Sequence, residues 1–220
     1  MELLSQDLSP ADRLARVQFA LAESAIGSTS GLLTLLASIY RFEPDRAAHL
    51  HRVATTSLTI GDRLRLPRHD LRHVERAALL HELGRIILPD DRFGSDDGPE
   101  GRRVHQTQAA CQAVSVVPML RPAADILAAV HERVDGRGLP LGLAGDAIPI
   151  GARIVSVADA LDALTALCVE MGLPADVLAV ELVEHAGTRF DPAVVAAVVR
   201  WLDSAPLGVP ALRPPGHVFV

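Results

Sequence analysis

The sequence predicts an all-α protein. Three segments repeat apolar residues every three or four positions, as amphipathic helices do, and segments with the alternating pattern of β-strands are scarce. These segments are RLARVQFALAESAI, DLRHVERAALLHEL and ADVLAVELVEHA. Hydrophobic residues make up 49% of the 220-residue chain, which is enough for a sizeable core within a single domain.

Residues 1–43 are predicted to form an N-terminal helical extension of two short helices. Ser9 and Pro10 are typical of a helix start, and the Gly/Ser/Thr run at 27–31 interrupts the helical pattern. The second helix, GLLTLLASIYRF, is apolar enough to pack on the core or on another protomer, so a homodimer through it is a hypothesis. Residues 204–220 form a Pro-rich C-terminal tail that we expect to be irregular.

The helical pattern over residues 75–91, ERAALLHELGRIILPDD, carries the adjacent pair His81 and Glu82. On a helix adjacent side chains diverge by about 100°, which lets both reach one ion at the helix edge. His51 lies upstream and His105 downstream. A single histidine is more often structural, but several with carboxylates in helical segments favour a site for Fe, Mn or Zn.

A Gly/Pro-rich loop is predicted inside residues 129–165. His131 and Glu132 end a helical run there, and Asp, Gly and Pro residues force turns at 135–140. Such a loop is costly in chain entropy and is hard to explain by packing alone, so we expect a functional site. The Gly/Asp-rich residues 90–103 are predicted to form a mobile loop beside it.

A helix is expected over residues 151–168, and it carries Asp159 and Asp162. Residues three apart on a helix are neighbours, so the two carboxylates share one face. A solvated acidic face is the alternative for an isolated pair of this kind. Asp159, however, lies among apolar neighbours, where a carboxylate requires a partner.

The order of these motifs resembles the HD-GYP family of cyclic di-GMP phosphodiesterases. The resemblance implies an all-helical HD-domain bundle over residues 44–203. It also implies two or three divalent metal ions, Fe or Mn rather than Zn, which activate a hydroxide against a phosphodiester. The matching elements, in chain order, are His51, HELGR at 81–85, His105, the loop-to-helix segment within 129–165 and AGTRFDPAVV at 186–195.

Roles can be carried over from the resemblance residue by residue. The implied metal ligands are His51, His81, Glu82, His105, His131 and Asp159, with Glu82 bridging two ions. Arg85 is the implied phosphate-facing catalytic residue, and Asp162, with Glu132, is expected to orient ligands. The implied substrate loop comprises Asp135, Gly136, Gly138, Leu139 and Pro140, together with Arg153.

The chain departs from the family pattern at positions that carry the chemistry. Glu82 replaces the family's aspartate, and Val130 replaces a histidine ligand of the second metal. Arg85 replaces a lysine and is a poor proton donor, and Leu139 replaces the signature tyrosine. No Arg-Pro-Tyr segment follows Thr165, so that part of the pocket is expected to be apolar.

Two function classes follow from this comparison. The first is a degenerate domain with one metal ion or none, weak or inactive in hydrolysis, which senses a nucleotide or metal or binds a signalling protein. The second is an active phosphodiesterase on cyclic di-GMP or a related phosphate ester. The four substituted positions favour the first class.

The composition of the chain limits the classes of partner that it can bind. A net charge of -6 and seven aromatic residues argue against DNA or RNA binding, whereas a cyclic dinucleotide ligand is compatible with local arginines. All 21 basic residues are arginine. Isolated Cys111 and Cys168, the lack of a signal-peptide pattern and the lack of a membrane-length apolar run predict a cytoplasmic protein without membrane contact. A signalling partner would be encoded separately.

Overall fold

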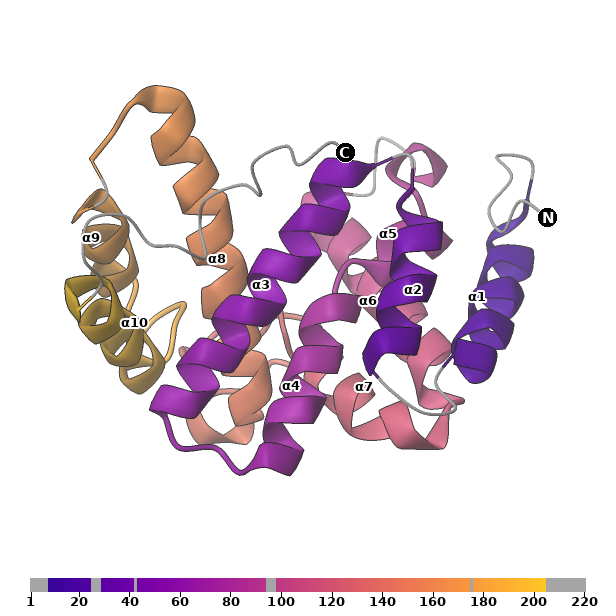
Figure 1. Ribbon diagram of the computed structural model, residues 1–220, viewed down its shortest axis with the longest axis horizontal. Helices are drawn as coiled ribbons and strands as arrows, with labels where there is room; N and C mark the ends of the chain where they lie inside the picture. Colours follow the sequence, from indigo (N-terminus) through magenta and orange to yellow (C-terminus); the bar gives the residue numbers. More distant parts are fainter. Residues whose placement is uncertain (1–7, 25–28, 42, 94–97, 175, 205–220) are drawn as a thin grey trace.

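A computed structural model describes residues 8–24, 29–41, 43–93, 98–174 and 176–204 of the chain (Figure 1). Within these residues the fold is all-α and contains no strand, as predicted. The predicted C-terminal tail lies outside the described residues beyond Ser204. The helices are α1 (Pro10–Ser24), α2 (Thr29–Ile39), α3 (Pro44–Arg63), α4 (Arg68–Leu80), α5 (Leu83–Ile87), α6 (Pro99–Ser115), α7 (Arg121–Leu127), α8 (Ile150–Met171), α9 (Asp176–Glu184) and α10 (Pro192–Ser204).

Helices α3, α4 and α8 pack against one another and carry much of the core. In Figure 1, α1 lies at one end of the molecule, and α9 and α10 lie at the other. Val53 and Ile60 of α3 and Ile154 and Leu161 of α8 are fully buried. Their spacing of seven residues in each helix keeps each pair on one face, which is the periodicity from which the helices were predicted.

The N-terminal helices pack on the same core. Helix α1 begins at Pro10 as predicted, and the hydroxyl of Ser9 accepts a hydrogen bond from the backbone N–H of Asp12 at 3.2 Å. Three leucines on the described part of α2 are buried within the chain, and the homodimer stays a hypothesis. The leucines are Leu32, Leu35 and Leu36, and Tyr40 directly after the helix is buried as well.

The helix predicted over residues 75–91 is interrupted at the His81-Glu82 pair. Helix α4 ends at Leu80, and the short α5 begins at Leu83. At Gly84 the chain presses against α6 so closely that a Cβ atom would overlap the backbone carbonyl of Gln106. His81 and Glu82 lie between the two helices, and their side chains point in different directions, as adjacent side chains of a helix also do.

The predicted loop over residues 90–103 is shorter than expected. A 3₁₀ turn covers Asp90–Arg92, and α6 already begins at Pro99, so Arg103 is helical. Proline suits the first turn of a helix, where its missing N–H leaves no intrahelical bond unmade. None of the described helices is both long enough and apolar enough to cross a membrane.

Candidate metal centre and adjoining pocket

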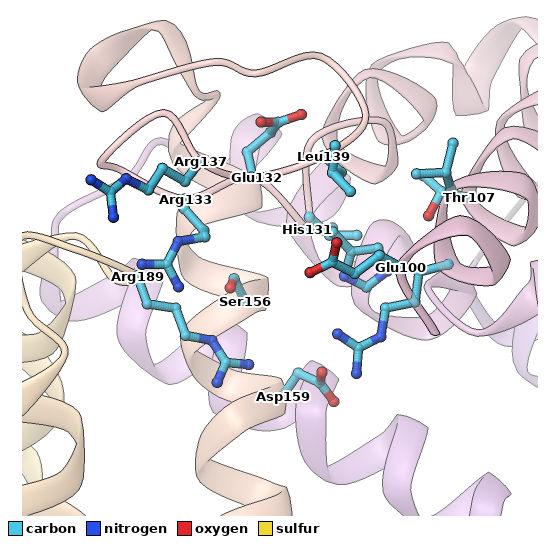
Figure 2. A pocket seen from close by; sticks show the side chains of 14 residues that line it. Glu100, Thr107, His131, Glu132, Arg133, Arg137, Leu139, Ser156, Asp159 and Arg189 are labelled. Atoms are coloured by element: carbon cyan, nitrogen blue, oxygen red, sulfur yellow. The ribbon is translucent and has the colours of Figure 1, made fainter. Parts of the chain in front are cut away.

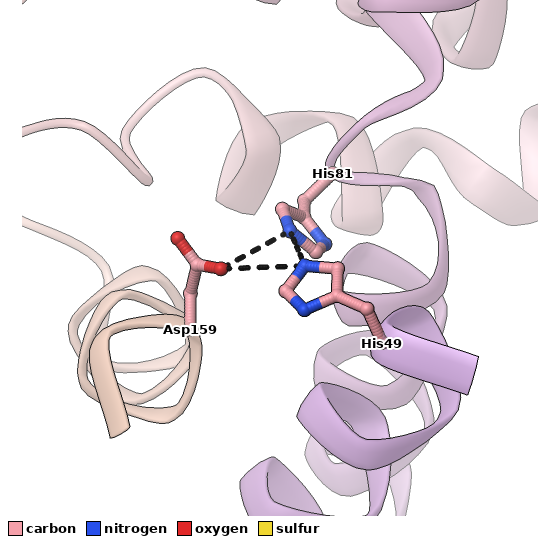
Figure 3. Close-up of side chains that lie close together, drawn as sticks. All are labelled: His49, His81 and Asp159. Carbon is pink, nitrogen blue, oxygen red and sulfur yellow. Dashed lines mark hydrogen bonds and ion pairs between the residues drawn. The ribbon is translucent and has the colours of Figure 1, made fainter. Parts of the chain in front are cut away.

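Three side chains from three different helical segments converge at one point (Figure 3). His49 comes from α3, His81 from the end of α4 and Asp159 from α8. Nε2 of His49 lies 3.3 Å from Nε2 of His81 and 3.4 Å from Oδ1 of Asp159. Nε2 of His81 lies 3.6 Å from the same oxygen. The three potential ligand atoms therefore form a nearly equilateral triangle.

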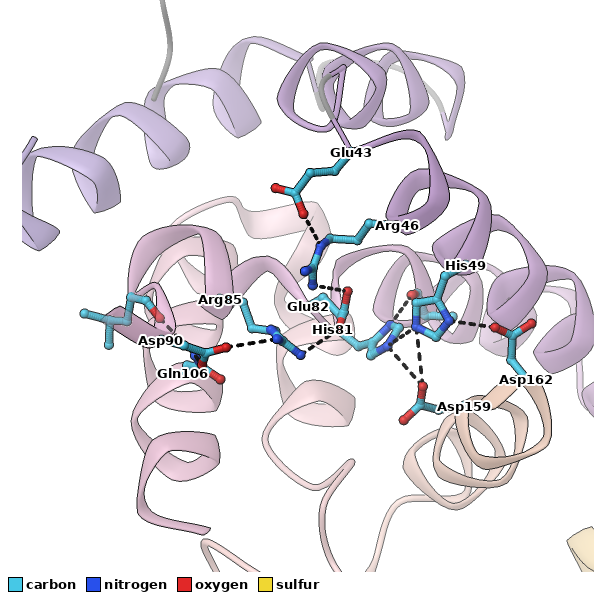
Figure 4. A network of polar contacts seen from close by, with 12 residues as sticks. Glu43, Arg46, His49, His81, Glu82, Arg85, Asp90, Gln106, Asp159 and Asp162 are labelled. Carbon is cyan, nitrogen blue, oxygen red and sulfur yellow. Dashed lines mark hydrogen bonds and ion pairs between the residues drawn. The ribbon is translucent and has the colours of Figure 1, made fainter. Parts of the chain in front are cut away.

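Both histidines are oriented through their other ring nitrogen (Figure 4). Nδ1 of His81 donates to the backbone carbonyl of Ala78 at 2.7 Å, and Nδ1 of His49 donates to Oδ2 of Asp162 at 2.8 Å. These partners favour the tautomer in which the Nε2 lone pair is available. Both Nε2 atoms therefore face each other and Asp159 as electron-pair donors.

The spacing of this group suits a single cation. Atoms that bind one tetrahedral ion at ~2.1 Å lie ~3.4 Å apart. The separations of 3.3, 3.4 and 3.6 Å agree with that spacing. Two imidazoles and a carboxylate are a donor set that Zn, Fe and Mn accept. His49, His81 and Asp159 are thus a candidate metal site.

The charges of the group reinforce one another. Burial raises the pKa of Asp159, but its interactions with His81 and His49 outweigh burial and lower that pKa to about 2. Burial lowers the pKa of His81, but the hydrogen bond and charge of Asp159 outweigh it and raise the pKa above its ordinary value. Asp159 therefore favours a positive charge at Nε2 of His81, which a proton supplies when no ion is bound and which a bound cation would replace.

The histidine of α3 in this group is His49, whereas the sequence predicted His51 as the ligand. His51 lies on the exposed side of α3 and is not a member of the group. Two residues correspond to about 200° of helical rotation, so the two histidines face opposite directions. The signal was present in the sequence, because His49, Val53 and Ile60 share the buried face of α3.

Glu82 does not join the three ligand atoms. Its Oε2 accepts from Nη1 of Arg46 at 2.9 Å, and its Oε1 lies 3.4 Å from Nη1 of Arg85 (Figure 4). Arg85 also donates to Asp90 at 3.0 Å, so the residue expected to face phosphate is engaged in ion pairs. The adjacent side chains of His81 and Glu82 thus belong to different networks.

The residues expected to bind a second metal do not join the group of His49, His81 and Asp159. His105 is exposed on α6 and stacks on Phe93, with ring centroids 6.1 Å apart. His131 lines the pocket described below but stands outside the three-residue group. Burial lowers its pKa to about 4, opposed by Asp159 and reinforced by Arg103. Val130 is buried and offers no ligand atom.

Asp162 is an orienting residue in this geometry. Besides His49, its carboxylate binds Arg52 with two hydrogen bonds, from Nε to Oδ1 at 2.6 Å and from Nη2 to Oδ2 at 2.9 Å. Burial raises the pKa of Asp162, but His49 and Arg52 together lower it below its usual value. The carboxylate is therefore ionised and fixes the His49 ring.

The loop after His131 is organised around Glu132. This carboxylate is 4% exposed and accepts the backbone N–H groups of Leu141 at 2.6 Å and Leu143 at 3.0 Å. At Gly138 any Cβ would overlap the backbone of Glu132 and Arg133, so the chain closes on itself only with glycine there. Glu132 holds the loop in place rather than binding a metal.

The remaining loop residues divide between structure and pocket. Asp135 forms a bidentate ion pair with Arg133, whose hydrogen bonds lower the pKa of Asp135 to about 2, and Gly136 adopts a positive φ of 76°. The Leu139-Pro140 bond is cis, and Leu139 faces the pocket. Arg153, expected in the substrate loop, is instead bound to Asp146 at 2.9 Å and Asp191 at 2.6 Å.

A pocket of about 320 Å³ opens beside Asp159 (Figure 2). Its lining is polar and rich in guanidinium groups. Figure 2 shows that Arg189 and Asp159 point toward the same space, whereas the head of Arg137 turns away. The lining residues are Glu100, Arg103, Val104, Thr107, Val130, His131, Glu132, Arg133, Arg137, Gly138, Leu139, Ser156, Asp159 and Arg189.

The arginines of the pocket correct one expectation. The segment after Thr165 contributes nothing to the lining, because α8 continues to Met171 and carries that segment away. Positive charge comes instead from Arg103 of α6 and Arg189 of the α9–α10 loop. Neither arginine was predicted, since residues 90–103 were expected to form a loop and Arg189 comes from a distant segment.

Comparison with known proteins identifies the class of this fold and site. The sequence profile of the HD domain matches residues 32–194. The chain therefore belongs to the HD-domain family. Its relatives are HD-GYP-type phosphodiesterases of cyclic dinucleotides.

Two curated relatives illustrate the resemblance. A cyclic di-GMP phosphodiesterase response regulator, RpfG, of Xanthomonas campestris pv. campestris is 33% identical over 161 residues, which cover 70% of this chain and 43% of that protein. A 3′3′-cGAMP-specific phosphodiesterase of Vibrio cholerae serotype O1 is 33% identical over 169 residues, covering 74% and 36%. The chain thus spans less than half the length of both.

Solved structures agree with the fold. An HD-GYP-type protein from Bdellovibrio bacteriovorus superimposes with a TM-score of 0.57 at 18% identity, covering 88% of this chain and 72% of that one. A cyclic GMP-AMP-specific phosphodiesterase of Vibrio cholerae gives a TM-score of 0.56 at 19% identity, covering 71% and 44%. At these identities the likeness concerns the fold alone.

Proposed function

We propose that this chain binds a cyclic dinucleotide at a single-metal centre and hydrolyses it slowly or not at all. It would then act through recognition, as a nucleotide or metal sensor or as a module that binds a signalling protein. The observation that carries the proposal is the ligand count. Three ligand atoms converge on one point, while both oxygens of Glu82 are engaged by Arg46 and Arg85.

The donor set fits one divalent ion. His49 and His81 would supply neutral imidazole and Asp159 a carboxylate, and Asp162 and the Ala78 carbonyl fix the rings. A bound ion supplies positive charge that polarises a phosphate group. These three ligands suit iron, manganese and zinc alike. The expectation of iron or manganese therefore rests on the family resemblance.

Slow hydrolysis follows from the missing second centre. Two cations clamp both the attacking and the leaving oxygen of a phosphodiester, and one cation cannot do both. Val130 offers no donor atom, and His105 is directed to Phe93 on the exposed side of α6. Arg85 cannot serve as a proton donor because its pKa is far above neutral pH.

Active hydrolysis is the second candidate function. It is favoured by the 33% identity to two cyclic dinucleotide phosphodiesterases and by the pocket that opens beside Asp159. In this reading His131, which lines the same pocket and is neutral at pH 7, assists the chemistry after substrate binding.

Turnover and binding measured together separate the two functions. The protein is purified without oxygen, loaded with Mn or Fe and assayed for cyclic di-GMP and 3′3′-cGAMP hydrolysis, with Asp159→Ala as the control. The proposal expects metal-dependent nucleotide binding by calorimetry without turnover above the control. Turnover that disappears in Asp159→Ala would establish the second function instead.

A further inference from the structure

The pocket beside the metal centre contains guanidinium groups without acidic partners. Of its four arginines, Arg133 is neutralised by Asp135, with contacts of 2.6 and 3.0 Å. Within the described part of the chain, no carboxylate lies in ion-pair distance of Arg103 or Arg189. The two side chains approach from α6 and from the α9–α10 loop, so distant segments bring positive charge to one cavity, beside the carboxylate of Asp159.

Arg103 and Arg189 are close enough to influence one another. Burial lowers the pKa of Arg189, and the charge of Arg103 is the next largest cause. Both arginines also reinforce the lowered pKa of His131, which lines the same cavity. The charge of Asp159 opposes this effect on Arg189 only in part, and two like charges near each other are stabilised by an anion placed between them.

The Arg189 guanidinium is positioned rather than free to swing. Its carbon atom Cζ lies 4.9 Å from the centroid of the Phe190 ring, in cation–π contact. Phe190 is itself 2% exposed and is anchored in the core. Figure 2 shows the guanidinium directed to the side of the cavity where Asp159 lies.

We infer that Arg103 and Arg189 form a phosphate clamp, here called the arginine clamp, that prefers a phosphate monoester to a phosphodiester. The inference deepens the proposed function by naming the phosphate class that the pocket retains. Two guanidinium forks and an ion at Asp159 present three cationic partners around one point. A monoester offers three terminal oxygens and two negative charges, whereas a diester offers two terminal oxygens and one charge.

A preference for the phosphate monoester would explain how the chain binds a nucleotide without hydrolysing it rapidly. A monoester is what remains when one ester bond of a phosphodiester has been hydrolysed. A pocket that holds the dianion more tightly than the diester retains that form of the nucleotide. Retention suits a sensor, whereas a hydrolase must release its products to turn over.

Two matched nucleotides test the arginine clamp. Guanosine 5′-monophosphate and guanosine 3′,5′-cyclic monophosphate share base and sugar and differ in phosphate charge. Calorimetry on the full chain is expected to give at least tenfold tighter binding of the monoester with Mn. With EDTA the preference should keep its direction but shrink, because only the two guanidinium groups then contribute positive charge. Equal binding, or tighter binding of the cyclic nucleotide, would overturn the inference.

Variants assign the preference to the two residues. Arg103→Ala and Arg189→Ala are each expected to weaken monoester binding about tenfold and to narrow the gap between the two nucleotides. Arg103→Lys and Arg189→Lys should each retain part of the monoester preference, because lysine keeps the positive charge. Arg72→Ala, an exposed residue of α4, is the control. A gap that persists in the double alanine variant would exclude the arginine clamp.

The same measurements distinguish this inference from the proposed function. Binding in EDTA and in His49→Ala does not depend on the metal centre. A wild-type chain that binds no metal but prefers the monoester would refute the single-metal proposal and support the arginine clamp. A wild-type chain that binds one metal ion but shows no monoester preference would support the single-metal proposal and refute the arginine clamp.

Discussion

The carboxylate of Asp162 accepts a hydrogen bond from Nδ1 of His49 at 2.8 Å. The same carboxylate is held by two hydrogen bonds from Arg52, so the imidazole is oriented from behind by an ion pair with a fixed geometry. Nε2 of His49 is thereby directed at His81 and Asp159. A residue of α8 thus controls how a residue of α3 presents its lone pair.

Asp162→Asn is expected to weaken metal affinity about 10- to 100-fold, because an amide holds the His49 tautomer less well than a carboxylate does. Calorimetric titration with Mn measures the affinity. Asp203→Asn, at an exposed position of α10, is the matched control. Equal affinity of the wild type and Asp162→Asn would show that Asp162 does not orient a metal ligand.

The two histidines of α3 should behave differently. His49→Ala removes one of three ligand atoms and is expected to abolish stoichiometric metal binding, whereas His51→Ala leaves it unchanged because His51 faces solvent. Metal content after gel filtration measures both. Metal binding that is lost in His51→Ala and kept in His49→Ala would show that His51 is the ligand.

A second metal should become bindable when the missing donors are restored. The double variant Glu82→Asp and Val130→His is expected to raise the ion count per chain from one to two, since it returns a shorter carboxylate and an imidazole. Each single variant serves as a control and should remain near one. A count of two in the wild type would remove the basis for this prediction.

Glu132→Ala should destabilise the loop that borders the pocket. The substitution leaves the N–H groups of Leu141 and Leu143 without their buried acceptor, at a cost of about 1–3 kcal/mol for each unsatisfied group. Urea denaturation measures the free energy of unfolding. Glu170→Ala, at an exposed position of α8, should change it by much less. Equal stability of the two variants would contradict the role of Glu132.

His131 should make stability fall on acidification. Its pKa is about 4 in the folded chain and about 6.5 when unfolded. Between these values the unfolded chain binds a proton that the folded chain does not, so stability decreases as pH falls from about 6.5 to 4. In EDTA, the wild type should lose about 2 kcal/mol more between pH 7 and 5 than His131→Gln. An identical loss in both would show that His131 titrates normally.

Most of the fold could be predicted from the sequence, because helical periodicity reports burial directly. The start of α1 at Pro10 and the shared face of Asp159 and Asp162 followed from local rules. The close approach of Gly84 to α6, next to the break at His81 and Glu82, could not be predicted, since it is a contact between separate segments of the chain. The same holds for the contact of Glu82 with Arg46, which comes from α3.

The site was harder to predict for the same reason. His49 was recoverable, because it shares the buried face of α3 with Val53. The charge of the pocket was not, since Arg103 and Arg189 meet only when α6 and the α9–α10 loop are placed together. Local sequence predicts which residues can bind metal or phosphate, whereas tertiary packing decides which of them meet.

The metal content of anaerobically purified protein loaded with Mn or Fe tests the central claim most directly. Our account predicts one ion per chain in the wild type, one in His51→Ala and none in His49→Ala. Two ions in the wild type, or an ion that persists in His49→Ala, would contradict a single centre built from His49, His81 and Asp159.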